Sequence, residues 1–184
     1  GRIHDGTFFT NPKLVDAFES ARKSGGTVHI LGLCSDGRVH SDLDHLYGLL
    51  EMSRRLRFPG DRVAVHAFTD GRDTGPRRGA EFIDAIETKS RELGIAPIAS
   101  VIGRFYAMDR DNRWERIEKA YRMLVHGEGA TFRSAAEAVR HYYDHPSDSN
   151  RTGDEFIVPS LIVSEGGQPR TIRDGDSVIF FNYR

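Results

Sequence analysis

The feature that most constrains the fold is an alternation of short apolar runs with longer segments of helical periodicity. Runs rich in Val, Ile, Leu and Phe, typical of buried strands, occupy residues 27–34, 62–68, 96–102 and 177–182. Helical periodicity is found over residues 12–23, 41–57, 77–93, 112–126 and 134–144. This alternation indicates βαβ units, so we predict an α/β fold in which one domain has a mainly parallel sheet and helices on both faces.

Three further features fit the alternation less simply. Residues 156–163 are apolar but contain Pro159, so we expect a strand with a proline bend. Residues 145–155 are polar and rich in turn formers, so we expect an exposed loop. Trp114, near a predicted helix start, is expected to be a packing residue.

Composition narrows the class of protein. The 184 residues, 38% hydrophobic and 29% charged, suit one globular domain, and no run approaches the roughly 20 apolar residues of a membrane span. The net charge of -1 argues against nucleic-acid or membrane partners. Cys34, the single cysteine, excludes an internal disulfide and favours a small buried side chain in a reducing, cytoplasmic setting.

Two further features of the sequence are its high arginine content and the residues at its two ends. Arginine supplies 22 of the 26 basic residues, which a GC-rich genome alone would explain, so each arginine is judged by its position. The chain begins at Gly1 rather than at a methionine, and Arg184 directly follows a strand. We therefore expect a piece of a longer protein.

Charged side chains follow the predicted strands. The first strand is followed by His40, the second by Arg72 and Asp73, the third by Arg104 and Arg110, and the last by Arg184. Because ligands of parallel sheets bind at the carboxyl ends of the strands, we predict that these residues converge on one site. The arginines would clamp a phosphate or carboxylate, while Asp73 would accept a proton and His40 would donate to an anionic oxygen.

Each of these residues also has a simpler interpretation. Asp70, followed by Gly71, is a common turn pair, and we expect it to have a structural role. Arg72 and Asp73 alone are compatible with an exposed ion pair, His40 with a neighbour of a helix cap, and Arg110 with a solvated face. Core or surface roles are expected for His29, His45 and His66.

Several known motifs are absent from the sequence. There is no Walker phosphate loop, no G-x-G-x-x-G, no H-E-x-x-H and no G-x-S-x-G elbow, and no histidine or acid spacing typical of a metal site.

Four segments carry a family resemblance. "SDGRVHSDLDHL", "HAFTDGRDTGP", "GRFYAMDRDNRWER" and "FFNYR" occur in the order found in cofactor-independent (2,3-bisphosphoglycerate-independent) phosphoglycerate mutase. The resemblance covers residues 1–184 but only part of the family's protein. It departs from the family at Arg38, where glycine is frequent, and at Asp42, where histidine is frequent.

The resemblance implies an isomerase of glycolysis and gluconeogenesis that interconverts 3-phosphoglycerate and 2-phosphoglycerate through a phosphoserine. The family's metal-binding domain holds two divalent metals, typically Mn²⁺, and the serine nucleophile. This chain resembles the other domain, the phosphotransferase domain inserted into the first, so we expect no metal in residues 1–184 and no activity from them alone. The expected partners are the two phosphoglycerates and the metal-binding domain of the same polypeptide.

The resemblance also implies roles for individual residues. By motif position, the substrate-binding residues are His40, Arg72, Asp73, Arg104, Arg110 and Arg184. Asp73 is implied to be the general acid/base for the glycerate hydroxyls. Two other classes stay open on the sequence alone: a non-catalytic module that binds small phosphorylated acids, and a nucleic-acid-binding domain, which the neutral net charge disfavours.

Overall fold

The computed structural model describes residues 11–34, 39–71, 78–95, 98–107 and 114–181. Its helices are α2 (Pro12–Ser24), α3 (Val39–Arg55), α4 (Gly79–Leu93), α5 (Arg104–Ala107), α6 (Trp114–His126) and α7 (Ala135–Asp144), with short 3₁₀ segments η3 (Gly60–Arg62) and η4 (Asp154–Phe156). Its strands are β1 (Val28–Cys34), β2 (Val63–Thr69), β3 (Ile98–Gly103), β4 (Ala130–Phe132), β5 (Ser160–Ile162) and β6 (Ser177–Phe180).

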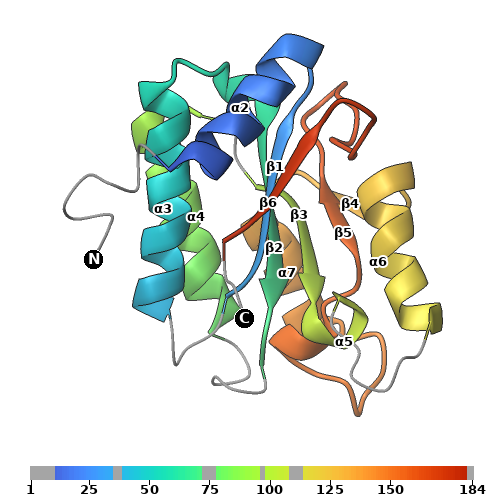
Figure 1. Cartoon of the computed structure of the whole chain (residues 1–184). Helices are drawn as coiled ribbons and strands as arrows, with labels where there is room; N and C mark the ends of the chain where they lie inside the picture. Colours follow the sequence, from blue (N-terminus) through green and yellow to red (C-terminus); the bar gives the residue numbers. More distant parts are fainter. Residues whose placement is uncertain (1–10, 35–38, 72–77, 96–97, 108–113, 182–184) are drawn as a thin grey trace.

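The strands form one six-stranded sheet in the order β4-β5-β3-β2-β1-β6. β6, β1, β2 and β3 are mutually parallel, whereas β5 runs antiparallel to β3 and carries β4 beside it. Helices cover both faces, with α2, α3 and α4 on one side of the sheet and α6 on the other (Figure 1). The predicted α/β fold with a mainly parallel sheet is confirmed.

Alternation along the central strands divides the core between the two faces. Ile30, Ala67 and Val101 pack in the larger cluster with side chains of α2, α3, α4 and α7. Their neighbours Leu31, Phe68 and Ile102 belong to a second cluster with side chains of α5 and α6. Because successive strand residues point to opposite faces, two hydrophobic layers hold one sheet in place.

Local sequence signals explain where the helices begin and end. Asn11 caps α2 by accepting hydrogen bonds from the backbone N–H groups of Lys13 and Leu14 at 3.0 and 3.3 Å. Gly25, with φ of 73°, ends the same helix in a left-handed conformation that glycine adopts without strain.

Three predictions about elements need correction. The strand expected over 156–163 is confirmed only as the short β5, because Pro159 has no N–H for the ladder; its carbonyl instead accepts from the N–H of Ala130 at 3.1 Å. The loop 145–155 is largely exposed, but Gly153 and Asp154 at its end are buried. Trp114, expected to pack, is the first residue of α6 and is 74% exposed.

The interpretation of the histidines is confirmed. His29 and His66 are buried and hydrogen-bonded to each other at 2.9 Å, while His45 is exposed. Cys34 is the last residue of β1, and its side chain lies outside what the structure describes.

Candidate functional site

The central strands end at one edge of the sheet, where the segments that carry the predicted site residues begin. In the parallel register, Cys34 of β1 lies opposite Thr69 of β2, which in turn lies opposite Gly103 of β3. The three strands therefore end at the same level. The segments that follow them carry the histidine, aspartate and arginines singled out from the sequence.

The structure describes only part of this predicted set. Arg104 is the first residue of α5 and follows β3 directly. His40 lies in the first turn of α3, and only its backbone is described. Outside the described residues lie Arg72, Asp73, Arg110 and Arg184, although Arg72 follows Gly71 directly in the chain.

Arg104 forms a buried ion pair that the sequence did not predict. Its Nη1 donates to Oδ1 of Asp70 at 2.8 Å, and the two residues are 4% and 1% exposed. The structural role expected for Asp70 thus takes the form of a contact between the ends of β2 and β3, across 34 residues of sequence. A guanidinium has five donors, so this bond is compatible with an additional anion contact.

Asp154 is a second residue that sequence reasoning missed. It lies in η4, and its carboxylate accepts hydrogen bonds from the Gly79 N–H at 2.6 Å and from the Tyr143 hydroxyl. Its carbonyl accepts from the Thr69 hydroxyl at 2.6 Å. The only local signal was the Gly153 turn, since these partners lie far away in the sequence.

The environment of Asp154 favours its neutral form. Burial raises its pKa to about 6, and the neighbouring Asp70 charge acts in the same direction. The bonds from Tyr143 and Gly79 act against this shift because they stabilise the carboxylate. Asp154 is therefore a buried carboxyl group whose pKa, at about 6, lies well above the usual range of an aspartate.

A row of four hydrogen-bonded polar side chains crosses the sheet away from this edge. Asp176 contacts His29 at 2.8 Å, His29 contacts His66 at 2.9 Å, and His66 contacts Ser100 at 2.6 Å. Burial lowers the pKa of His29 and lowers that of His66 further. With both rings neutral, only one direction satisfies every contact: Ser100 donates to His66, His66 to His29, and His29 to the carboxylate.

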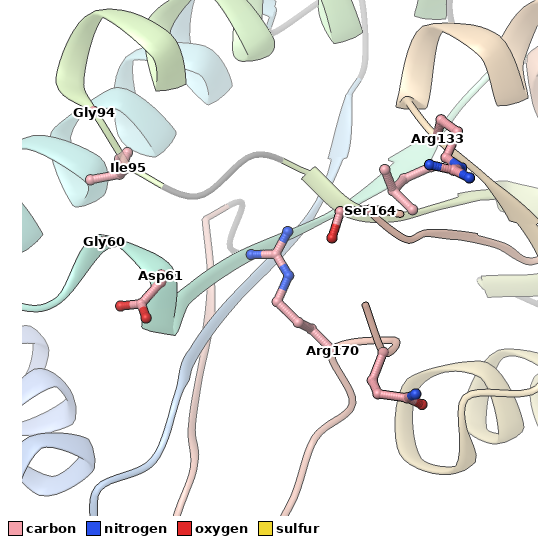
Figure 2. Close-up of a pocket in the computed structure, with 9 residues that line it drawn as sticks. Gly60, Asp61, Gly94, Ile95, Arg133, Ser164 and Arg170 are labelled. Carbon is pink, nitrogen blue, oxygen red and sulfur yellow. The ribbon is translucent and has the colours of Figure 1, made fainter. Parts of the chain in front are cut away.

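The described residues also line a pocket of about 530 Å³ at the opposite edge (Figure 2). Gly60 and Asp61 precede β2, and Ser164 follows the antiparallel β5, so the pocket lies at the amino ends of the central strands. Arg170 extends into it, and its Nη1 donates to the carbonyl of Val63 at 3.2 Å. No predicted site residue lines this pocket.

Two kinds of feature are absent from the described part of the chain. No helix there is long and apolar enough to cross a membrane. Within the same ranges, no group of three or more His, Cys, Asp or Glu side chains is arranged to hold a metal ion.

Comparisons with known proteins agree on one family. The family model described as "BPG-independent PGAM N-terminus" matches residues 1–184. The chain is 52% identical over 182 residues to a 2,3-bisphosphoglycerate-independent phosphoglycerate mutase of Rhodopirellula baltica, and 48% identical over 182 residues to one of Moorella thermoacetica. Each match covers 99% of this chain but 34% of the relative, so the chain spans about a third of the length of these relatives.

A solved structure gives the same result. The structure of Leishmania mexicana phosphoglycerate mutase at low cobalt concentration matches with a TM-score of 0.80 at 33% sequence identity. The match covers 96% of this chain and 33% of that one.

Proposed function

The chain belongs to the BPG-independent phosphoglycerate mutase family, of which it matches the N-terminal model over residues 1–184, and on that premise we propose that it is the phosphotransferase domain of such an enzyme. The full-length polypeptide would interconvert 3-phosphoglycerate and 2-phosphoglycerate in the cytoplasm. This domain would bind the glycerate and supply the general acid/base. One observation carries the proposal: β1, β2 and β3 end level at one edge, where Arg104 and the residues leading into Arg72 and Asp73 meet.

The proposed chemistry divides between recognition and proton transfer. His40, Arg72, Arg104, Arg110 and Arg184 would hold the carboxylate and phosphate of the substrate, because arginine forks match both groups. Asp73 would protonate the glycerate oxygen that loses the phosphoryl group to the serine of the other domain. It would then accept the proton of the second hydroxyl as that oxygen takes the phosphoryl group back.

We assign no metal-dependent step to this chain, because the family resemblance places the two divalent ions, typically Mn²⁺, in the other domain. Among the described residues, no group of three or more His, Cys, Asp or Glu side chains is arranged to hold a metal ion. When bound in the other domain, the two ions would supply charge stabilisation for the transferring phosphoryl group.

Asp73→Asn in the full-length enzyme tests the central assignment. The amide cannot exchange the proton, so we expect turnover to fall roughly 10²- to 10⁴-fold while phosphoglycerate binding changes little. Asp84→Asn, an exposed position on α4, is the matched control and should retain full turnover. Near-normal turnover of Asp73→Asn would show that another residue is the general acid/base.

A further inference from the structure

The segment from Asp154 to Ile157 contacts three elements beside the proposed site: the ends of β2 and β3 and the start of α4. The Asp154 carbonyl accepts from the Thr69 hydroxyl at the end of β2, at 2.6 Å. The Ile157 carbonyl accepts from the Gly103 N–H at the end of β3, at 2.7 Å. The Asp154 carboxylate accepts from the Gly79 N–H at the start of α4, at 2.6 Å. One short segment thus joins the ends of two strands to the start of the helix.

Glycines allow these contacts to be close. A Cβ on Gly103 would lie 2.3 Å from the Glu155 carbonyl oxygen, and one on Gly79 would lie 2.7 Å from Oδ1 of Asp154. Gly71 has φ of 71°, and a Cβ there would lie 2.7 Å from the Glu155 nitrogen. A side chain at any of these three glycines would clash. The backbone at the glycines therefore packs directly against residues 154–157, including the Asp154 carboxylate.

The charged and titratable groups around Asp154 come from each neighbouring element. Asp70, at the end of β2, raises the pKa of Asp154, and Asp70 is itself bound to Arg104 of α5. Tyr143 of α7 donates its hydroxyl to the carboxylate, and the backbone N–H of Arg78 at the start of α4 also favours the charged form. Protonation of Asp154 therefore changes its hydrogen bonds with α4 and α7 and its electrostatic interaction with Asp70.

We propose that Asp154 is a positioning residue for phosphoryl transfer: its ionised carboxylate holds the start of α4 and its backbone holds the end of β2, which sets both ends of the stretch carrying Arg72 and Asp73. The same segment holds Gly103 and hence the start of α5 at Arg104. Asp154 touches neither substrate nor reacting atoms in this scheme. The inference rests on the proposed function, because it concerns the site defined there.

Asp154→Asn in the full-length enzyme tests this role. The amide imitates the protonated acid, since it still accepts from Gly79 through its oxygen but loses the charge. The ratio of variant to wild-type kcat/KM should be near one at about pH 5 and fall to about a tenth at pH 8, the loss typical of one charged hydrogen bond. A merely structural defect would lower kcat/KM by the same factor at every pH.

Two further variants keep the test decisive. Tyr143→Phe removes a bond that stabilises the carboxylate, so it should move the acid limb of the wild-type kcat/KM profile to higher pH even if Asp154→Asn fails to fold. Asp144→Asn, one residue further along α7 and exposed, should leave the profile unchanged. A variant ratio that does not change with pH, or a Tyr143→Phe profile identical to wild type, overturns the inference.

Asp73→Asn, assayed in parallel, separates this inference from the proposed function. If Asp73→Asn keeps its turnover, the proposed general acid/base is wrong, whatever Asp154 does. If Asp73→Asn is inactive while the Asp154→Asn ratio is constant with pH, only the positioning role fails.

Discussion

At the residue scale, Arg104, which we propose to bind substrate, is held in place by a buried contact. It is buried at the end of β3 and bonded to Asp70 at 2.8 Å, so one edge of its guanidinium is already oriented. A flexible arginine would lose rotamer freedom on binding an anion, whereas an oriented one loses less. The buried pair therefore favours specific recognition. Compared with an apolar pair of similar volume it adds little stability, although removing only one of its partners is costly.

Asp70→Asn is expected to destabilise the fold. The substitution removes the negative charge that is bound to the buried Arg104 guanidinium, and we expect the free energy of unfolding to fall by about 3 kcal/mol, as for other broken buried pairs. Urea unfolding of the 184-residue chain measures this loss. The exposed Asp84→Asn should change it by less than about 0.5 kcal/mol, and a similarly small loss for Asp70→Asn would contradict the prediction.

For the described residues around the proposed site, position in the chain was more predictable than contacts. The position of Arg104 after a strand followed from the apolar run that precedes it, because strand ends can be read locally. Its bond to Asp70 spans 34 residues, and the bond from Thr69 to Asp154 spans 85. Such contacts depend on the order of strands in the sheet, which periodicity does not specify.

At the element scale, the buried histidine chain ties the central strands together. His29 lies on β1, His66 on β2 and Ser100 on β3, and Asp176 directly precedes β6. Each of these four side chains has a hydrogen-bond partner, as buried polar groups require. The hydrogen bonds thus join the four parallel strands whose following segments carry the proposed site residues.

These histidines should make folding stability depend on pH. Burial lowers the pKa of both His29 and His66 below 6.5, so the unfolded chain takes up protons first as pH falls. Their contribution is fully present above about pH 6.5 and is lost below it. Between pH 7.5 and 5.5 we expect the free energy of unfolding to fall by roughly 1–3 kcal/mol, measured by urea unfolding at each pH.

Two variants test the assignment of this pH dependence. His66→Gln should reduce the slope of stability against pH, whereas His45→Gln, at an exposed position, should leave it unchanged. Asp154 acts in the opposite sense around and below its pKa of about 6, where the folded chain takes up the proton before the unfolded chain does, so it offsets part of the loss. An equal slope for His66→Gln and wild type would contradict the prediction.

The elements themselves were predicted well where their patterns were long. The helices and the four parallel strands follow from periodicity and apolar runs, and α2 and α4 end at Gly25 and Gly94 with the left-handed φ that glycine allows. β4 and α5 were missed because each spans three or four residues, too few for a period to show. Tertiary contacts, such as those of Pro159 with Ala130, determine these short elements.

At the scale of the whole molecule, the two edges of the sheet have different character. The carboxyl edge holds the buried Asp70–Arg104 pair and the contacts of Asp154. The amino edge holds the described pocket, around Arg170 and Asp61 (Figure 2). In open α/β sheets ligands bind beyond the carboxyl ends of the strands. The pocket at the amino ends is therefore no argument against a substrate site at the carboxyl ends.

The isolated 184-residue chain is expected to fold and yet to catalyse nothing. Folding follows from its two hydrophobic clusters, which cover both faces of one sheet. The absence of turnover follows from the proposed division of labour, in which the serine nucleophile and the metals belong to the rest of a polypeptide about three times as long. An acid/base and an anion clamp without a phosphoryl acceptor leave the substrate bound and unchanged.

Phosphorus NMR of 3-phosphoglycerate incubated with the purified chain and Mn²⁺ tests this expectation, with the full-length enzyme as the positive control. We expect no 2-phosphoglycerate signal from the chain. Substrate binding should be weak, because the anion clamp remains while closure by the second domain is lost. Arg104→Met should reduce this binding further, since it removes one arginine of the clamp. Metal-dependent conversion by the chain alone would contradict the division of labour, since residues 1–184 would then have to contain their own phosphoryl acceptor.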